Sequence, residues 1–166
     1  MGKRTDRENG CVEITVEGSL PRSFGLTRRE VAAAACAFAQ SSSSRCGIPF
    51  RAVAVVLQDD AASDAAHRAI MDVPGATDVI TQGYDPMPGE EPGVYGELYV
   101  NVERAILAAP HRRHWSAAKE LLLYIAHGMD HLSDADDHTP ADAARMRRRE
   151  LAWLGRWWRS VKSREG

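Results

Sequence analysis

The chain has 166 residues, of which 44% are hydrophobic and 27% charged, with a formal net charge of −2. This length suits one core, so residues 1–166 are expected to form a single domain. No apolar run approaches the length of a membrane span, and the charged start MGKRTDRENGC lacks the apolar segment of a signal peptide. Three cysteines without a CxxC pair indicate reduced thiols. Composition therefore excludes a membrane protein and predicts a cytoplasmic one.

The charges are unevenly distributed along the chain. Residues 59–97 carry nine acids and one base, whereas residues 145–166 carry eight bases and two acids. A basic C-terminal surface can follow a phosphate backbone, and it can equally be a solvated helix face without a partner. The total charge does not indicate a nucleic-acid binder, but this distribution keeps one open.

The N-terminal part predicts a strand followed by a helix. Residues 11–16 alternate in polarity and are rich in β-branched residues, which is typical of a strand. Thr27 is placed to cap a helix over 29–40, with Glu30 at the capping-box position. The serine run 41–44 is expected to end this helix as a loop.

The middle of the chain predicts three more strands and one helix. Residues 50–57 are an apolar strand, and residues 60–71 have the composition of a helix, which a Pro-Gly pair then breaks. Residues 77–81 predict the next strand. A long loop rich in glycine and proline, 83–96, leads to the last strand at 97–102.

Three helices are expected after the last strand. They cover residues 103–109, residues 116–131, and a segment that begins at Thr139-Pro140, where threonine caps and proline takes the first helical position. The last helix has one core-facing stripe, formed by Met146, Glu150, Trp153, Leu154, Trp157 and Val161. The order β-α-β-α-β-β-α-α-α predicts a mixed α/β domain, a small four-stranded sheet packed by about five helices.

The helix at 116–131 carries the most informative pattern. His127 and His131 are four residues apart, so both rings project from one helical face. Two buried imidazoles that bind no metal would each need a separate polar partner. With His138 arriving from the chain just beyond, three histidines can bind zinc and leave a coordination position open. Such a zinc lowers the pKa of bound water to about 7, so a metal-dependent hydrolase is expected.

Four segments, in the same order, match the motifs of one family. The first is a His-Gly-x-x-His-Leu motif with a third histidine, found here as 127–132 with His138. A methionine and a glutamate follow it, here Met146 and Glu150, and two strand motifs precede it, TDVIT and GELYVNVERA. Over about residues 53–154 the chain therefore resembles the YbeY family, bacterial endoribonucleases implicated in ribosomal RNA maturation.

This resemblance implies a function as well as a fold. It implies a zinc-dependent endoribonuclease specific for single-stranded RNA, with one zinc per chain held by His127, His131 and His138 on a central helix. It also implies processing of the 3′ end of small-subunit ribosomal RNA and a part in ribosome quality control. The implied partners are ribosomal RNA and the small ribosomal subunit.

The chain departs from the family pattern around the third histidine. Six residues separate His131 from His138, where the family usually has five, and Ser133-Asp134-Ala135 replaces the usual glycine segment. A wider turn can accommodate one residue, so His138 is the expected third ligand. Asp137 occupies the usual position and is the alternative, because an aspartate oxygen also binds zinc. Asp130 replaces a usually apolar residue, and it is expected either to hydrogen-bond an imidazole or to face solvent.

A second departure concerns the arginine that the family carries before its Thr-Asp-Val strand and that is thought to handle phosphate. That position is Met71 here, and the nearest arginine is Arg68, one helical turn earlier. Arg68 takes the role if its side chain points into the cleft; the alternative is a solvated arginine. Gln82 also stands where the family usually has phenylalanine.

The remaining catalytic roles have several candidates. A carboxylate of Asp130, Asp134 or Asp137 can act as general base. Arg68, or an arginine of the pair 112–113, can offset charge on the transition state through a bidentate contact.

Two other functions remain open on the sequence. One is a zinc metallopeptidase, although HExxH enzymes place their glutamate base directly after the first histidine, where this chain has Gly128. The other is a ribosome-associated RNA-binding protein with weak catalysis and a structural metal, which the loss of arginine at Met71 favours.

Overall fold

The structure is a computed structural model, and it describes residues 12–165. Its centre is one four-stranded sheet with the strand order β1-β2-β4-β3. The strands are β1 (Glu13–Glu17), β2 (Phe50–Gln58), β3 (Val79–Tyr84) and β4 (Val94–Asn101). β1 and β4 run parallel to β2, whereas β3 runs antiparallel to β4 and forms one edge of the sheet.

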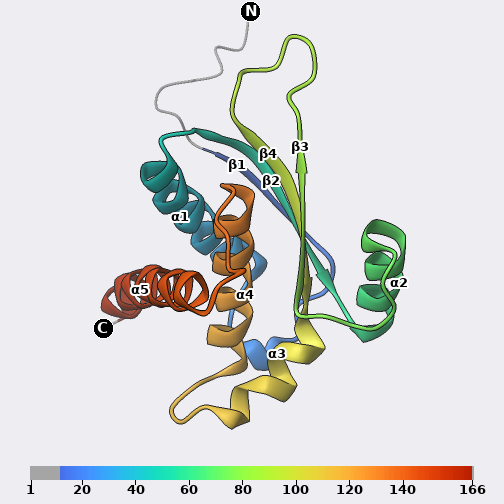
Figure 1. The fold of residues 1–166 in the computed structure, drawn as a ribbon. Coiled ribbons are helices and arrows are strands. Elements are labelled where there is room, and N and C mark those ends of the chain that lie inside the picture. Colours follow the sequence, from blue (N-terminus) through green and yellow to red (C-terminus); the bar gives the residue numbers. More distant parts are fainter. Residues whose placement is uncertain (1–11, 166) are drawn as a thin grey trace, which may run out of the picture.

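Five α-helices pack around this sheet. They are α1 (Arg28–Cys46), α2 (Asp60–Met71), α3 (Val102–Ala108), α4 (Ala117–Leu132) and α5 (Pro140–Glu165), with short 3-10 turns at Arg22–Phe24 and Ala109–His111. Figure 1 shows α1, α4 and α5 on one side of the sheet and α2 on the other, beside β3. The predicted mixed α/β fold with a four-stranded sheet and five helices is confirmed.

The main core lies between the sheet and the helices α1 and α4. The strands β2 and β4 and both helices contribute apolar side chains with almost no exposed surface, among them Val31, Phe38, Val55, Leu98, Leu121 and Ile125. α4 is the most deeply buried helix, because it packs on the sheet through one side and contacts α1 and α5 through the others. A side chain near its C-terminal end is therefore held by the whole core.

The predicted helix starts agree with the structure. Thr27 and Glu30 form both hydrogen bonds of a capping box at the start of α1. Ser116 accepts a hydrogen bond from the backbone N–H of Lys119 at the start of α4, and Thr139 accepts one from Asp142 at the start of α5. The expected stripe of α5 is buried or packed against the core.

The serine run was expected to be a loop, and this expectation is wrong. Residues 41–44 continue α1, which ends only at Cys46 and is capped by Gly47, a left-handed residue with φ of 75°. Ser42 is fully buried, and its hydroxyl donates to the backbone oxygen of Met129 in α4 at 3.1 Å. The helix tolerates this serine because a tertiary partner satisfies its hydroxyl.

Other boundaries differ by a few residues. β3 and β4 extend further than expected, so the connecting loop covers only residues 85–93. Cys11, the first residue of the expected N-terminal strand, lies outside the described residues. Within residues 12–165, no helix combines the length and the apolarity that crossing a bilayer requires.

Candidate metal centre

The C-terminal end of α4 brings two imidazoles together. His127 and His131 stand one helical turn apart, with their rings edge to face and the ring centroids 4.4 Å apart. The two Nε2 atoms are only 3.0 Å from each other. Both side chains remain about a quarter exposed, so their Nε2 atoms meet at an accessible point next to the buried core.

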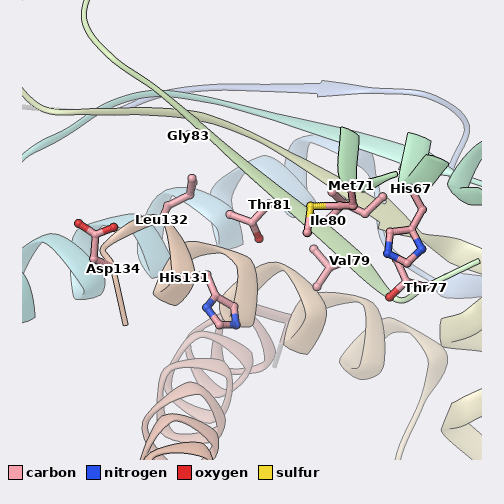
Figure 2. Close-up of a pocket in the computed structure, with 10 residues that line it drawn as sticks. All are labelled: His67, Met71, Thr77, Val79, Ile80, Thr81, Gly83, His131, Leu132 and Asp134. Carbon is pink, nitrogen blue, oxygen red and sulfur yellow. The ribbon is translucent and has the colours of Figure 1, made fainter. Parts of the chain in front are cut away.

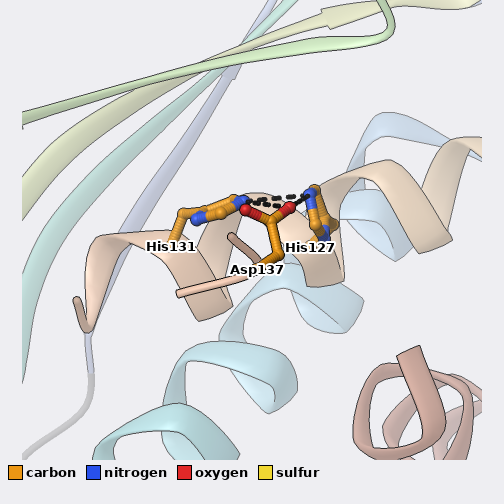
Figure 3. A group of neighbouring side chains, drawn as sticks. All are labelled: His127, His131 and Asp137. Atoms are coloured by element: carbon orange, nitrogen blue, oxygen red, sulfur yellow. Dashed lines mark hydrogen bonds and ion pairs between the residues drawn. The ribbon is translucent and has the colours of Figure 1, made fainter. Parts of the chain in front are cut away.

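Asp137 completes this pair from the turn between α4 and α5 (Figure 3). Its Oδ2 atom lies 3.5 Å from Nε2 of His131 and 3.8 Å from Nε2 of His127. Ligand atoms about 2.0–2.2 Å from a tetrahedral zinc lie roughly 3.3 Å from one another. The three donor atoms are thus spaced as ligands of one small cation, and two nitrogens with one oxygen form a donor set that zinc accepts.

His138 lies outside this group, contrary to the expectation from the sequence. Its side chain is 87% exposed, and its Nδ1 atom is 3.0 Å from Asp136. The backbone N–H of His138 also donates to the same Asp136 oxygen at 2.7 Å. The turn therefore directs Asp137 toward the two histidines. The additional residue, His138, points into solvent directly before the N-cap of α5.

The outer nitrogen of each imidazole has its own acceptor. Nδ1 of His127 is 2.8 Å from Oε1 of Glu150, and Nδ1 of His131 is 3.1 Å from the backbone oxygen of Ala135. A carboxylate and a carbonyl accept hydrogen bonds, so each Nδ1 carries the proton and each Nε2 keeps its lone pair. Partners of this kind fix the orientation of metal-binding histidines.

Glu150 is completely buried, and only one of its two carboxylate oxygens is hydrogen-bonded. Its Oε2 atom is buried without a hydrogen-bond partner among residues 12–165. A buried carboxylate with so few partners is costly unless a positive charge lies close to it. A cation at the Nε2 atoms would supply that charge through His127, which makes this orphaned oxygen a second indication of a metal site.

The charges around His127 favour a positive charge at the same place. Burial lowers the pKa of this imidazole, but the hydrogen bond and charge of Glu150, with the charges of Asp137 and Asp78, raise it above 6.5 overall. Asp78 stands just before β3, so carboxylates from three separate segments act on one ring. An environment that favours an imidazolium also favours a bound metal cation.

Arg68 does not reach this centre. Its side chain is 61% exposed and pairs with Asp64, one turn back on α2, at 3.0 Å. The same carboxylate accepts the backbone N–H of Gly75 at 2.6 Å and so holds the loop after α2. The two arginines at 112–113 are also distant, because they precede α4 at the end opposite to His131.

Asp130 was expected to hydrogen-bond an imidazole or to face solvent, and the structure shows neither. It is completely buried and accepts hydrogen bonds from Arg149 at both oxygens, at 2.9 Å each. Arg45 of α1 approaches the same carboxylate at 3.5 Å. Asp130 therefore neither bonds an imidazole nor faces solvent, and its engaged oxygens are a poor general base.

Gly128 allows α4 to approach the sheet closely. A Cβ atom at this position would lie 2.7 Å from a methyl carbon of Leu98 on β4. A side chain at this position would have to displace Leu98, which is fully buried, or move α4 away from β4. A glutamate directly after the first histidine, as in an HExxH peptidase, would therefore require this packing to rearrange.

A cleft of ≈ 410 Å³ opens beside the metal-binding group, between α2, β3 and the end of α4 (Figure 2). His131, Leu132 and Asp134 line one side, and His67 and Met71 line the other. Residues of β3 line it between them. The cleft is open to solvent and leads directly to one of the two paired histidines.

A sequence model of the family described as Endoribonuclease YbeY matches residues 25–157. The chain belongs to the YbeY family. The match includes the strands β2 to β4, the helices α1 to α4, the three clustered side chains and Glu150. The family recognised from the ordered motifs is thereby confirmed.

Individual YbeY proteins agree with this assignment. The Endoribonuclease YbeY of Rhodopirellula baltica is 37% identical over 145 residues, which cover 85% of this chain and 71% of the relative. That of Symbiobacterium thermophilum is 35% identical over 100 residues, covering 57% of this chain and 64% of the relative. The solution structure of TM1509 from Thermotoga maritima has a TM-score of 0.59 at 18% identity, covering 91% of this chain and 93% of TM1509. This last likeness shows a shared fold.

Three residues near the YbeY metal motif were not recognised as site residues from the sequence. Glu150 was matched to the family's methionine and glutamate and placed on the stripe of α5, but it was given no role at the metal; a carboxylate on an otherwise apolar stripe was the available signal. Asp78 belongs to the TDVIT motif, and nothing local relates it to His127. His67 was not considered, although its spacing to Met71 places both on one face of α2.

Proposed function

We propose that this chain is a zinc-dependent endoribonuclease that cleaves single-stranded RNA during ribosomal RNA maturation. His127, His131 and Asp137 hold the metal in this proposal. The observation that carries it is the convergence of two imidazole nitrogens and a carboxylate oxygen beside an open cleft, in a chain of the YbeY family. Ribosomal RNA of the small subunit, in the cytoplasm, is the proposed substrate.

The protein residues around the metal have separate tasks. When bound, zinc supplies an activated water and polarises a phosphoryl oxygen. Glu150 and the Ala135 carbonyl hold the rings so that both Nε2 atoms keep their lone pairs. Asp134 on the cleft and Asp78 near His127 are the carboxylates left to accept a proton from the attacking water. Three protein ligands leave a fourth position for the reaction, as in catalytic zinc sites.

A metallopeptidase with the HExxH arrangement is not supported, because the position of its glutamate is Gly128, which packs closely on Leu98. A purely structural metal is also less compatible with the geometry. Structural zinc sites are closed by four protein ligands, whereas the partly exposed His127 and His131 are met by one carboxylate.

The proposal is tested by cleavage of an end-labelled single-stranded RNA with zinc-loaded protein. We expect cleavage by the parent and none by His131→Ala or by the parent with a chelator, because each loses the bound metal. Duplex RNA and single-stranded DNA of the same sequence should stay intact. Circular dichroism of His131→Ala shows whether its fold survives.

Absence of cleavage by a parent that holds one zinc per chain would contradict the proposal. It would favour an RNA-binding protein without catalysis. Unfolding of His131→Ala together with an inactive parent would indicate a structural metal.

The basic surface of α5 gives a second expected result. Arg147 and Arg148 are exposed on this helix. Replacing both by alanine should weaken RNA binding several-fold and lower the slope of log K against log salt by up to about 1.4, since each lost contact to a single strand removes about 0.7. Fluorescence anisotropy at several salt concentrations measures both quantities.

Arg22→Ala is the matched control for the double variant, because it removes an exposed arginine outside α5. It should leave the salt slope unchanged. A double variant with the affinity and slope of the parent would show that RNA does not follow α5.

A further inference from the structure

His67 lies on the wall of the cleft opposite the metal-binding group. It comes from the last turns of α2, whereas His131 comes from α4, and both side chains line the same cleft (Figure 2). Met71 follows one turn later on the same face of α2 and also lines the cleft. A strand of RNA that reaches His131 through the cleft would therefore pass this face of α2.

The ring of His67 is fixed by a single hydrogen bond. Its Nδ1 atom is 2.8 Å from the backbone oxygen of Gly75. A carbonyl oxygen only accepts, so Nδ1 carries the proton and Nε2 of the neutral ring is a free acceptor. Within residues 12–165, the ring makes no other hydrogen bond.

The loop that carries Gly75 is held independently of the cleft. Asp64 accepts the Gly75 N–H at 2.6 Å, while His67 donates to the Gly75 carbonyl. Arg68 engages Asp64 from the solvent side of α2 and does not line the cleft. Asp64 and His67 together bind both backbone groups of Gly75, and we call this pair of hydrogen bonds the Gly75 clamp. Of these two residues, His67 lines the cleft, and its Nε2 atom takes no part in the clamp.

The chemistry of a nucleic-acid backbone indicates what such an acceptor can bind. Phosphate and ether oxygens only accept hydrogen bonds, and the 2′-hydroxyl of ribose is the one backbone group that donates. The same hydroxyl distinguishes RNA from DNA. A free Nε2 acceptor on a residue that lines the cleft is therefore complementary to ribose and not to deoxyribose.

We propose that Nε2 of His67 accepts a hydrogen bond from a ribose 2′-hydroxyl of the RNA strand in the cleft, and so contributes to selection of RNA over DNA. This inference rests on the proposed function, since it requires RNA to enter the cleft. His67 then contacts substrate at a distance from the metal ligands and sets affinity for the strand.

Two substitutions distinguish the proposed Nε2 contact with RNA from the Nδ1 hydrogen bond to Gly75. In His67→Asn the amide nitrogen replaces Nδ1, so the hydrogen bond to Gly75 is kept and the Nε2 acceptor is lost. In His67→Gln the amide lies near the position of Nε2, so an acceptor is kept and the clamp is lost. A purely structural His67 would therefore tolerate asparagine better than glutamine, and an RNA-binding His67 the reverse.

The experiment is anisotropy of zinc-loaded protein with a labelled single-stranded RNA and a DNA of the same sequence, on ice, with RNA integrity checked on a gel afterwards. We expect His67→Asn to bind RNA about tenfold more weakly and DNA as the parent does, with an unchanged melting temperature and zinc affinity. We expect His67→Gln to have a lower melting temperature and an RNA affinity nearer to the parent.

Each other outcome overturns the inference. If His67→Asn bound RNA as tightly as the parent, His67 would act only in holding Gly75. If the variant lost affinity for RNA and DNA equally, a 2′-hydroxyl contact would be excluded. In both cases the parent still binds RNA and the proposed function stands. A parent that binds neither strand would overturn the proposed function and this inference together.

Discussion

Replacing Asp137 with alanine should weaken zinc binding by about a hundredfold or more, whereas His138→Ala should leave it within about twofold. Loss of even an outer partner of a metal ligand costs about 10–100-fold in affinity, so loss of a ligand costs at least as much. His138 is 87% exposed and its Nδ1 atom pairs with its neighbour Asp136, so its removal leaves the three converging atoms in place.

The two adjacent substitutions control for each other. Asp137 and His138 both lie in the turn between α4 and α5, and each substitution removes one polar side chain that is not in the core. Competition with a chromophoric chelator gives the zinc affinity, and the melting temperature of the zinc-free proteins shows that both variants fold. Asp137→His should restore tight binding, because an imidazole nitrogen at this position can replace the carboxylate oxygen.

The opposite order of affinities would contradict this assignment. If His138→Ala lost the metal while Asp137→Ala kept it, the turn would have to rearrange on zinc binding so that His138 reaches the pair. The third ligand would then be the one expected from the sequence.

Much of the fold could be predicted because the signals that determine it are local. The capping box at Thr27 and Glu30, the limits of α2 and the buried stripe of α5 each depend on residues a few positions apart. The serine run was misassigned because the partner of Ser42 is the carbonyl of Met129, 87 residues later. No pattern within α1 contains that information.

The same distinction applies to the metal centre. The pairing of His127 with His131 follows from helical periodicity, which the sequence displays. The choice between Asp137 and His138 depends on the path of an irregular turn, where neighbouring side chains point in different directions. Asp130 could not be placed either, because its environment depends on Arg149 of the next helix and on Arg45 of α1.

Asp130→Ala should lower the free energy of unfolding by about 3–5 kcal/mol, the cost typical of breaking a buried ion pair by removing one partner. The carboxylate is fully buried, and Arg149 is only 22% exposed. Removing the carboxylate leaves the guanidinium without its two close hydrogen-bonded acceptors. Chemical denaturation of the zinc-free protein measures the loss.

A double substitution distinguishes loss of the whole Asp130–Arg149 ion pair from loss of one partner. In Asp130→Leu with Arg149→Met both charges are removed and the space is filled by apolar groups, which is often neutral or stabilising. Most of the lost stability should therefore return. Arg145→Ala is the surface control, because its ion pair with Asp142 is solvent-accessible and should contribute less than about 1 kcal/mol.

The ion pair also affects the metal centre through its position in the chain. Asp130 lies between His127 and His131 on α4, and Arg149 directly precedes Glu150, which holds His127 from α5. If the pair fixes how α5 sits on α4, zinc affinity should fall in Asp130→Ala and recover in the double variant together with stability. Unchanged stability in Asp130→Ala would show instead that Arg149 finds solvent or another acceptor at little cost, and that apolar packing alone aligns α5 with the histidines.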